Sequence, residues 1–554
     1  MKKIAIFLTL LSLTTILSAN KILISNLKLT GKNTGSHYIM VQFDVSWENS
    51  WRTSSTPNNW DAAWIFVKYR SLGGAWSHAW LNNTGHTAPG GSTIETGLLD
   101  PSSAFNPTTN PGMGVFHYRN ADGTGTFTKT GVKLQWNYGA NGVSDATNVE
   151  IKVFAIEMVY VPQGAFYAGD GATTNVYGNF TRHNTTSSFQ VTDESVPSTL
   201  GGTTAGNLGN NNAASMGVAD DFNNSTTKAL PLAYPKGYNP LYGMKYEISQ
   251  QEYADFLNNI TATQATARYP NYNGSSRHAI SVSGGVYQTT LPNVACNYLS
   301  WADLAAYLDW SSLRPMTELE FEKSCRGTAA AVPSELAWGT ATVVSSVYSL
   351  LNSGAANEAI GANYSTILGN ESYNVTNSSI SAPVRVGIFA GTSGNINRVT
   401  SGSTFYGQME MSGSIWDRTV SLGTPQGRTF TGVHGNGALT AAGDADPLYW
   451  PPVLSAAGIS FRGGCLVSNA VETTVSGRYY SNTSLDHRDY YMGGRGIRSV
   501  CLPVMTTTAA GTITSNSASS GGEYNLRWRE IRNRAGHLLE HFNGPDDCIT
   551  NQNQ

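Results

Sequence analysis

The sulfur chemistry open to this chain is limited by the positions of its five cysteines. Cys465 directly follows Arg462-Gly463-Gly464, and residues 466–500 contain no other cysteine. A thiolate is a good nucleophile and a soft ligand for Cu(I), but linear ligation of Cu(I) needs a second thiolate close by. No C-x-x-C or H-E-x-x-H pattern occurs, so the sequence indicates neither a zinc ribbon nor a zinc protease. Cys465 is therefore the residue of this region that favours an enzyme.

A polar, tyrosine-rich segment follows Cys465. Tyrosine combined with serine, asparagine and glycine is typical of adaptable binding surfaces, because tyrosine gives contact area at low entropic cost and small polar residues give hydrogen bonds. The alternative is an ordinary polar loop with structural tyrosines. The residues predicted to bind a ligand are Ser468, Asn469, Tyr479, Tyr480, Asn482, Ser484, His487, Asp489, Tyr490 and Tyr491.

Composition and charge exclude one class of partner and indicate export. Only 13% of the residues are charged and the net charge is −3, so the chain lacks the clustered lysine and arginine that bind nucleic acid. Residues 1–19 resemble a signal peptide, with a basic start, a short apolar run and a small residue at the cleavage point. The alternative for this run is a membrane anchor. No later apolar run is long enough to cross a membrane. We expect an exported bacterial protein, secreted or at the cell surface, with no membrane span after signal cleavage.

Two structured regions must position the polar segment. Residues 20–156 contain alternating stretches such as YIMVQFDVSW and GVKLQWNYG between Gly, Asn, Pro and Ser clusters, which predicts an N-terminal all-β sandwich domain. Residues 157–502 form a predicted α+β domain with few helices and long Gly-rich loops. Ser249 with Glu252, and Thr317 with Glu320, have the spacing of capping boxes at two of its helices. Ser300 is the predicted cap of a third helix.

The second region also contains a series of motifs in a fixed order: MVYVPQGAFYAGDG, YEISQQEYADFLN, LSWADLAAYLDWSSLRPMTELEFEKSCRG, MEMSGSIWDR, FRGG and GIR. The ordered set resembles the formylglycine-generating enzyme family, also called sulfatase-modifying factor domains. The resemblance implies a C-type-lectin-like fold with little regular secondary structure.

The resemblance further implies a structural calcium ion in the MEMSGSIWDR loop. The family binds calcium here through two side chains and backbone carbonyls, and the matching ligands are Glu410, Gly413, Ile415 and Asp417. Both acids offer the hard oxygens that Ca²⁺ prefers. The alternative is that these acids are solvated or cap backbone amides.

The chain departs from the family at its copper chemistry. Oxidases of the family bind copper through two cysteines beyond the RGG element, and the matching positions here are Ser468 and Thr473. Neither hydroxyl is a good ligand for Cu(I), and Cys465 alone cannot complete the pair. We therefore expect a pseudoenzyme with no catalytic residue and no copper. The alternative is a copper-dependent formylglycine-generating oxidase, or a related protein-modifying enzyme, that uses Cys465.

The polar segment also resembles the variable segments of diversity-generating retroelement proteins. Those segments lie between RGG-like and GFR-like elements of this same domain type, and here the diversified part would cover about residues 465–495. The predicted function is ligand binding by a non-catalytic scaffold, with an extracellular protein or glycan as the partner.

Residues 503–554 differ from the rest of the chain. TTTAAGTITSNSASSGGEYN resembles a linker followed by the first strand of an Ig-like repeat, and the basic stretch after it has no counterpart upstream. Codons allowed for that stretch, read one base over, encode a plausible continuation of the repeat. We hypothesise a frameshift that truncated the repeat, and we expect this part to be disordered. The alternative is a genuine short basic tail.

Overall fold

The computed structural model describes residues 22–172, 176–183, 185–210, 216–374, 382–484, 486–500, 505–507 and 522–524. The predicted signal peptide and most of the predicted linker and truncated repeat lie outside these residues. Two short strands of that tail, β24 (Met505–Thr507) and β25 (Gly522–Tyr524), pair antiparallel. Strands hold 32% and helices 9% of the described residues. The architecture is therefore mostly β with few helices, and the predicted α+β class fits it only loosely.

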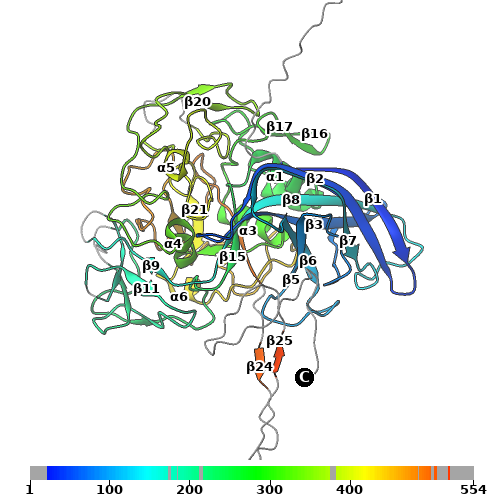
Figure 1. Ribbon diagram of the computed structural model, residues 1–554, viewed down its shortest axis with the longest axis horizontal. Coiled ribbons are helices and arrows are strands. Elements are labelled where there is room, and N and C mark those ends of the chain that lie inside the picture. The colour runs from blue at the N-terminus through cyan, green and yellow to red at the C-terminus, as the bar shows by residue number, and fades with distance from the viewer. Residues whose placement is uncertain are drawn as a thin grey trace, which may run out of the picture.

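A seven-stranded sheet runs through the middle of the molecule and joins the two predicted regions (Figure 1). Its order is β23-β15-β8-β3-β6-β5, with β4 paired to β3. Strand β8 crosses the predicted boundary at 156/157, and β15 and β23 of the second region extend the sheet beyond it. The bounds are β3 Asp61–Ser71, β4 Ser77–His78, β5 Ser92–Leu98, β6 Gly112–Arg119, β8 Val149–Val161, β15 Leu241–Met244 and β23 Ile497–Ser499.

A second sheet of three strands covers one face of the first sheet. It contains β1 (Leu23–Asn33), β2 (Tyr38–Arg52) and β7 (Gly123–Trp136), in the order β1-β2-β7. The alternation in β2 buries Phe43 and Trp47 against the seven-stranded sheet. The two sheets thus form a β-sandwich.

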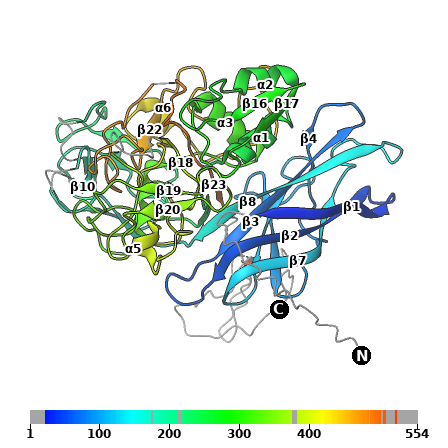
Figure 2. The ribbon, with the colours of Figure 1, turned by 90° about the horizontal axis from the view of Figure 1, so that it is seen from above.

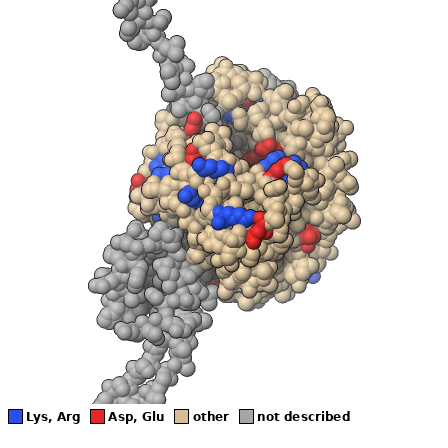
Figure 3. All heavy atoms as spheres, turned by 90° about the vertical axis from the view of Figure 1, so that its right-hand side faces the viewer, with Lys and Arg blue, Asp and Glu red and all other residues tan. Residues whose placement is uncertain are grey.

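On the face of the molecule in Figure 3, uncharged surface predominates and the few Lys and Arg lie among Asp and Glu.

Strand β3 is buried on both faces, because the second region covers the side of the sheet that the sandwich leaves open (Figure 2). Ile65 belongs to the sandwich core, whereas its neighbours Trp64 and Phe66 belong to the core of the second region. The Trp64 indole donates to the Ser311 carbonyl at 2.9 Å. One strand therefore serves two hydrophobic cores.

Helices α1, α3 and α4 of the second region begin where the sequence predicts caps. The bounds are α1 Gln250–Leu257, α2 Ala262–Arg268, α3 Trp301–Trp310, α4 Glu318–Arg326, α5 Arg398–Ser401 and α6 Pro425–Arg428. The capping boxes of Ser249 with Glu252 at α1 and Thr317 with Glu320 at α4 are confirmed. Ser300 caps α3 as predicted, with Asp303 as the other half of its box.

Short strands and long loops make up the remainder of the second region. β21 lies between β18 and β22 in a three-stranded sheet that carries the FRGG motif at its edge. The short strands are β9 Phe166–Ala168, β10 Phe180–Arg182, β11 Phe189–Val191, β12 Thr199–Leu200, β13 Leu208–Asn210, β14 Lys228–Ala229, β16 Ile280–Ser283, β17 Val286–Thr289, β18 Met316–Thr317, β19 Ser349–Leu351, β20 Ala359–Ala362, β21 Asp417–Val420 and β22 Ile459–Arg462.

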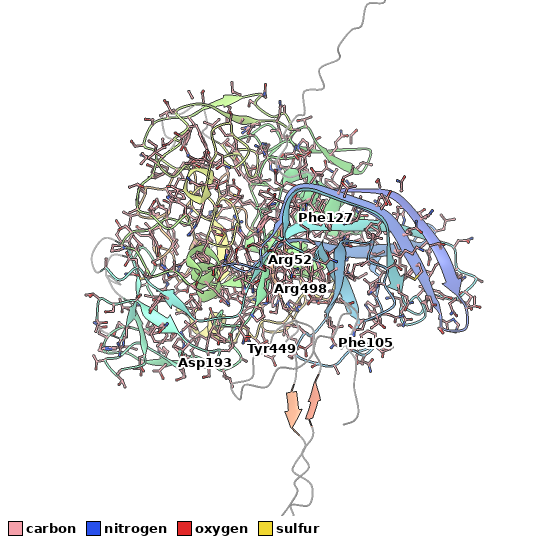
Figure 4. The ribbon with its side chains drawn as sticks, viewed as in Figure 1. Arg52, Phe105, Phe127, Asp193, Tyr449 and Arg498 are labelled. Carbon is pink, nitrogen blue, oxygen red and sulfur yellow. The ribbon has the colours of Figure 1, made fainter. Side chains whose placement is uncertain are left out.

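Side chains also tie the second region to the sandwich. Arg498, the arginine of the GIR motif, lies at the junction of the two regions (Figure 4). Its guanidinium donates to the carbonyls of Leu98 and Ser312, and its Cζ lies 4.4 Å from the centroid of the Trp64 ring. The GIR motif therefore fixes the end of the second region against strands β3 and β5.

Candidate functional site

Two carboxylates of helix α4 form ion pairs with the arginine of the RGG element. Arg462 ends β22 with its side chain fully buried, and it pairs with Glu322 at 2.7 Å and Glu318 at 3.3 Å. Burial opposes ionisation of Glu322, but the guanidiniums of Arg462 and Arg326 outweigh it and hold the pKa of Glu322 below its ordinary value. The start of the polar segment is thus fixed to the helix.

A second buried arginine fixes the middle of the segment. Arg478 pairs with Asp220 at 2.8 Å and with Glu318 at 2.9 Å, and all three side chains are fully buried. Arg462 and Arg478 therefore share Glu318 as a partner. Between these arginines, Thr473 and Ser476 are also buried. We call residues 462–478 the anchor of the segment.

Partly exposed tyrosines follow the anchor. Tyr480 packs edge-on against Trp416, with ring centroids 5.7 Å apart, and Tyr479 contacts Tyr480 at 4.7 Å. Tyr490 and Tyr491 form a second pair at 4.9 Å. All four tyrosines are partly exposed, and we call them the tyrosine face.

Trp416 lies under the tyrosine face and connects its two pairs. The backbone N–H of Trp416 donates to the carbonyl of Tyr491 at 3.0 Å, while its ring contacts Tyr480. Its exposed fraction is 5%, and it belongs to the main hydrophobic core. The face thus rests on a core residue and not on a loop side chain.

The other predicted binding residues differ in how far they are exposed. His487 and Asp489 stand 4.0 Å apart with about a third of each side chain exposed. Asn482 is partly exposed, and Asn469 and Ser484 are exposed. Ser468 lies apart from this group: it is buried, and its Oγ accepts the N–H of Cys465 at 3.1 Å. Ser468 thus shapes the anchor, and its hydroxyl does not reach the surface.

Cys465 sits inside the anchor as a buried thiol. Its exposed fraction is 1%, and its Sγ lies 3.5 Å from the Ser468 Oγ. Burial raises the pKa of the Cys465 thiol to about 11, so it stays protonated at neutral pH. A protonated, enclosed thiol is neither a strong nucleophile nor a ready metal ligand.

The position of the family's second copper cysteine is occupied by a hydroxyl that already has a partner. The Thr473 Oγ donates to the Glu371 carboxyl at 3.0 Å, and both side chains are buried. Burial raises the pKa of Glu371 to about 8. One protonated thiol and one hydroxyl bound to a carboxyl do not fit a copper ion that needs two thiolates.

The four residues implied as calcium ligands do not form an open oxygen cage. Both carboxylate oxygens of Asp417 accept from the Arg495 Nε, at 2.9 and 3.0 Å. One oxygen of Glu410 accepts from the N–H of Gly387 at 2.9 Å, and burial raises the pKa of Glu410 to about 7. Gly413 and Ile415 lie buried between these acids in sequence. A guanidinium already occupies the charged end of this loop, so the arrangement does not fit calcium. The residues that the structure describes include no cluster of three or more His, Cys, Asp or Glu side chains suited to a metal ion.

Sequence reasoning missed the arginines that organise this site. Arg478 and Arg495 were not singled out, although each follows a glycine in a run of small and aromatic residues. Such a residue in a loop that folds into a core needs a buried carboxylate partner, and that pattern is the signal that would have found both. Glu247 was also missed, and its carboxylate accepts from Ser414 Oγ at 2.9 Å and from the Ile415 N–H at 3.2 Å.

Comparisons with known proteins place the second region in a family. Residues 209–499 match the family model described as FGE-sulfatase, the sulfatase-modifying factor enzyme 1-like domain, which confirms the predicted resemblance. Among solved structures, the chain is similar to Treponema denticola variable protein 1, with 14% identity and a TM-score of 0.26, over 62% of this chain and 96% of that one. The curated protein sequences gave no match. In the part of the chain that the structure describes, no helix has the length and apolarity needed to cross a membrane.

Proposed function

The chain belongs to the sulfatase-modifying factor enzyme 1-like family, and from that premise we propose that it is a non-catalytic, ligand-binding member of it. The proposed protein is secreted or displayed at the cell surface. It uses the family scaffold, which we take to be C-type-lectin-like, to present the tyrosine face to an extracellular protein or glycan. In the fuller form of the proposal, a retroelement diversifies the exposed positions within about residues 465–495.

The tyrosine face is the observation that carries this proposal. Four partly exposed tyrosines stand together over Trp416, and the chain leading to them is fixed by buried ion pairs. Tyrosine is enriched in binding surfaces, since it buries a large ring while its hydroxyl keeps a hydrogen bond. A fixed backbone lowers the entropic cost of binding.

The state of Cys465 supports binding over catalysis. Oxidative chemistry at this position would require a thiolate and a second soft ligand, whereas the thiol is protonated and Thr473 is bound to Glu371. A Cu(I) titration tests the point. We expect no stoichiometric binding by the wild-type protein; one equivalent bound, and lost in Cys465→Ala, would favour the oxidase instead.

Diversification is supported by the way burial divides the segment. Replacements at the exposed or partly exposed Asn469, Asn482 and Ser484 leave the buried ion pairs untouched, whereas replacements at Arg462 or Arg478 break them. Sequencing this gene across sister strains tests the idea. We expect variation concentrated at the exposed positions of 465–495, with the two arginines unchanged. Variation spread evenly over the whole domain would remove the retroelement version.

Binding itself is tested with the intact protein on a printed glycan array and on a library of extracellular proteins. Any partner found should lose at least about tenfold in affinity when Tyr480→Ala and Tyr491→Ala are combined, since aromatic anchors dominate such interfaces. Tyr38→Ala is the matched control, because Tyr38 is also partly exposed but lies in β2 of the sandwich. Equal losses in both variants would place the binding surface elsewhere.

A further inference from the structure

One guanidinium binds a carboxylate that the family resemblance gives to calcium, that of Asp417. The Arg495 Nε donates to both oxygens of Asp417, and its Nη1 and Nη2 donate to the carbonyls of Met409 and Glu410 at 2.9 and 3.0 Å. The partners are thus one carboxylate and two backbone carbonyls, all hard oxygens. This is the kind of donor set that calcium takes in proteins.

The surroundings of Arg495 are acidic and closed to water. The exposed fraction of the side chain is 1% for Arg495 and 3% for Asp417. Two further buried carboxyls, Glu247 and Glu410, interact electrostatically with the same guanidinium. Arg385 is the other cation that faces Glu410. The loop therefore holds more carboxyl than guanidinium groups, and the buried carboxylate of Asp417 requires a cation beside it.

Arg495 meets that requirement without an added ion. A calcium ion bound to Asp417 would lie directly beside the guanidinium, and the two positive charges would repel each other in a poorly hydrated site. The Asp417 carboxylate cannot serve both cations at once. Arginine keeps its charge at all accessible pH values and donates several hydrogen bonds in a fixed plane.

We propose that Arg495 is the built-in cation of the 409–417 loop and replaces calcium in this chain. The fold then does not depend on calcium. Truncating Arg495 leaves Asp417, the carbonyls of Met409 and Glu410, and the neighbouring Glu247 without their cation. That vacated set accepts Ca²⁺, with water completing the coordination sphere.

Thermal unfolding of the full chain in calcium and in chelator tests the proposal. The wild-type protein should show the same Tm in both and no heat of calcium binding in calorimetry. Arg495→Ala should unfold about 5 °C or more lower in chelator, because it leaves buried carboxylates unpaired. Calcium should restore a large part of that loss. Arg314→Ala is the matched control, since Arg314 forms a similarly buried pair with Glu320 at 2.6 Å outside the loop. It should lose stability that calcium does not restore.

Three results would overturn the proposal. They are a wild-type Tm that rises with calcium together with saturable binding, an Arg495→Ala protein as stable as wild type, and a calcium response of equal size in Arg495→Ala and Arg314→Ala. If Arg495→Ala does not fold in chelator, the test is whether it refolds when calcium is added. Recovery in calcium supports the proposal and failure to recover contradicts it, while wild-type calorimetry decides calcium binding without any variant.

Discussion

The anchor and the tyrosine face are neighbours in sequence, yet they are opposite in structure. In the anchor, Ser468, Thr473 and Arg478 are all buried and hydrogen-bonded. After it, the four tyrosines of the face are partly exposed. A partly exposed surface therefore follows a largely buried base. For Thr473 and Arg478, the difference is a carboxyl partner from a distant part of the chain.

The largest expected effect comes from breaking the anchor. Arg478→Ala should lower the free energy of unfolding by about 3–5 kcal/mol, because it leaves the buried carboxylates of Asp220 and Glu318 without their guanidinium. Urea unfolding followed by tryptophan fluorescence measures the change. The control is Arg182→Ala, an exposed arginine of β10 that should change stability by no more than about 0.5 kcal/mol. A loss below about 1 kcal/mol in Arg478→Ala would show that the pairs are not required.

The second effect depends on pH and concerns Glu371, the buried carboxyl that accepts a hydrogen bond from Thr473 of the anchor. The pKa of Glu371 is raised by burial from 4.5 to about 8, so the folded protein holds an extra proton between these values. The contribution of neutral Glu371 to the free energy of unfolding is then fully present below pH 4.5. It is lost as the pH rises through about 8. Glu371→Gln removes this dependence, because an amide does not titrate.

The variant should therefore match the wild-type protein in acid and become the more stable one by about 2–3 kcal/mol near neutral pH. Urea midpoints measured for both proteins across that range give the difference directly. A difference that does not change with pH would contradict the raised pKa.

A smaller effect is expected from a comparison of two serines, one buried in the anchor and one exposed beyond it. Ser468→Ala should cost about 1–2 kcal/mol, since it leaves the buried N–H of Cys465 without its acceptor at 3.1 Å. Ser484 is exposed and lies beyond the anchor. The free energy of unfolding of Ser484→Ala should stay within about 0.5 kcal/mol of the wild-type value. Equal costs in the two variants would remove the distinction between anchor and face.

The smallest effect is expected in the tyrosine face itself. Tyr490→Ser should cost only about 0.5–1 kcal/mol, which is the worth of its ring contact with Tyr491 at 4.9 Å. Differential scanning calorimetry measures the shift in Tm. A loss as large as that of Arg478→Ala would mean that this tyrosine is part of the core and cannot be free to vary.

Features set by neighbouring residues could be predicted from the sequence, and features set by distant partners could not. The capping boxes at Ser249 and Thr317 depend on residues three positions away, and both were predicted. The family was also recognised, from the order of its motifs. The burial of Ser468 depends on the fold around Cys465, and nothing in its own residue type distinguishes it from Ser484.

The cation beside the implied calcium ligands was missed for the same reason. The acids of the 409–417 loop are visible in the sequence, but their cation, Arg495, lies 78 residues away from Asp417. Likewise Arg478 finds Asp220 across 258 residues. Only the fold shows which acid is neutralised by which arginine, and therefore which acids are left to bind an ion.

The seven-stranded sheet has a mechanical consequence for a protein that displays a binding face. β8 carries the chain out of the sandwich and is hydrogen-bonded to β3 on one side and β15 on the other, so no linker separates the two regions. Lys245 adds a buried pair with Asp61 of β3 at 3.4 Å across the same junction. A continuous ladder of hydrogen bonds therefore joins the sandwich to the second region. If the tyrosine face binds a partner as proposed, this ladder would transmit a pull on that partner to the sandwich.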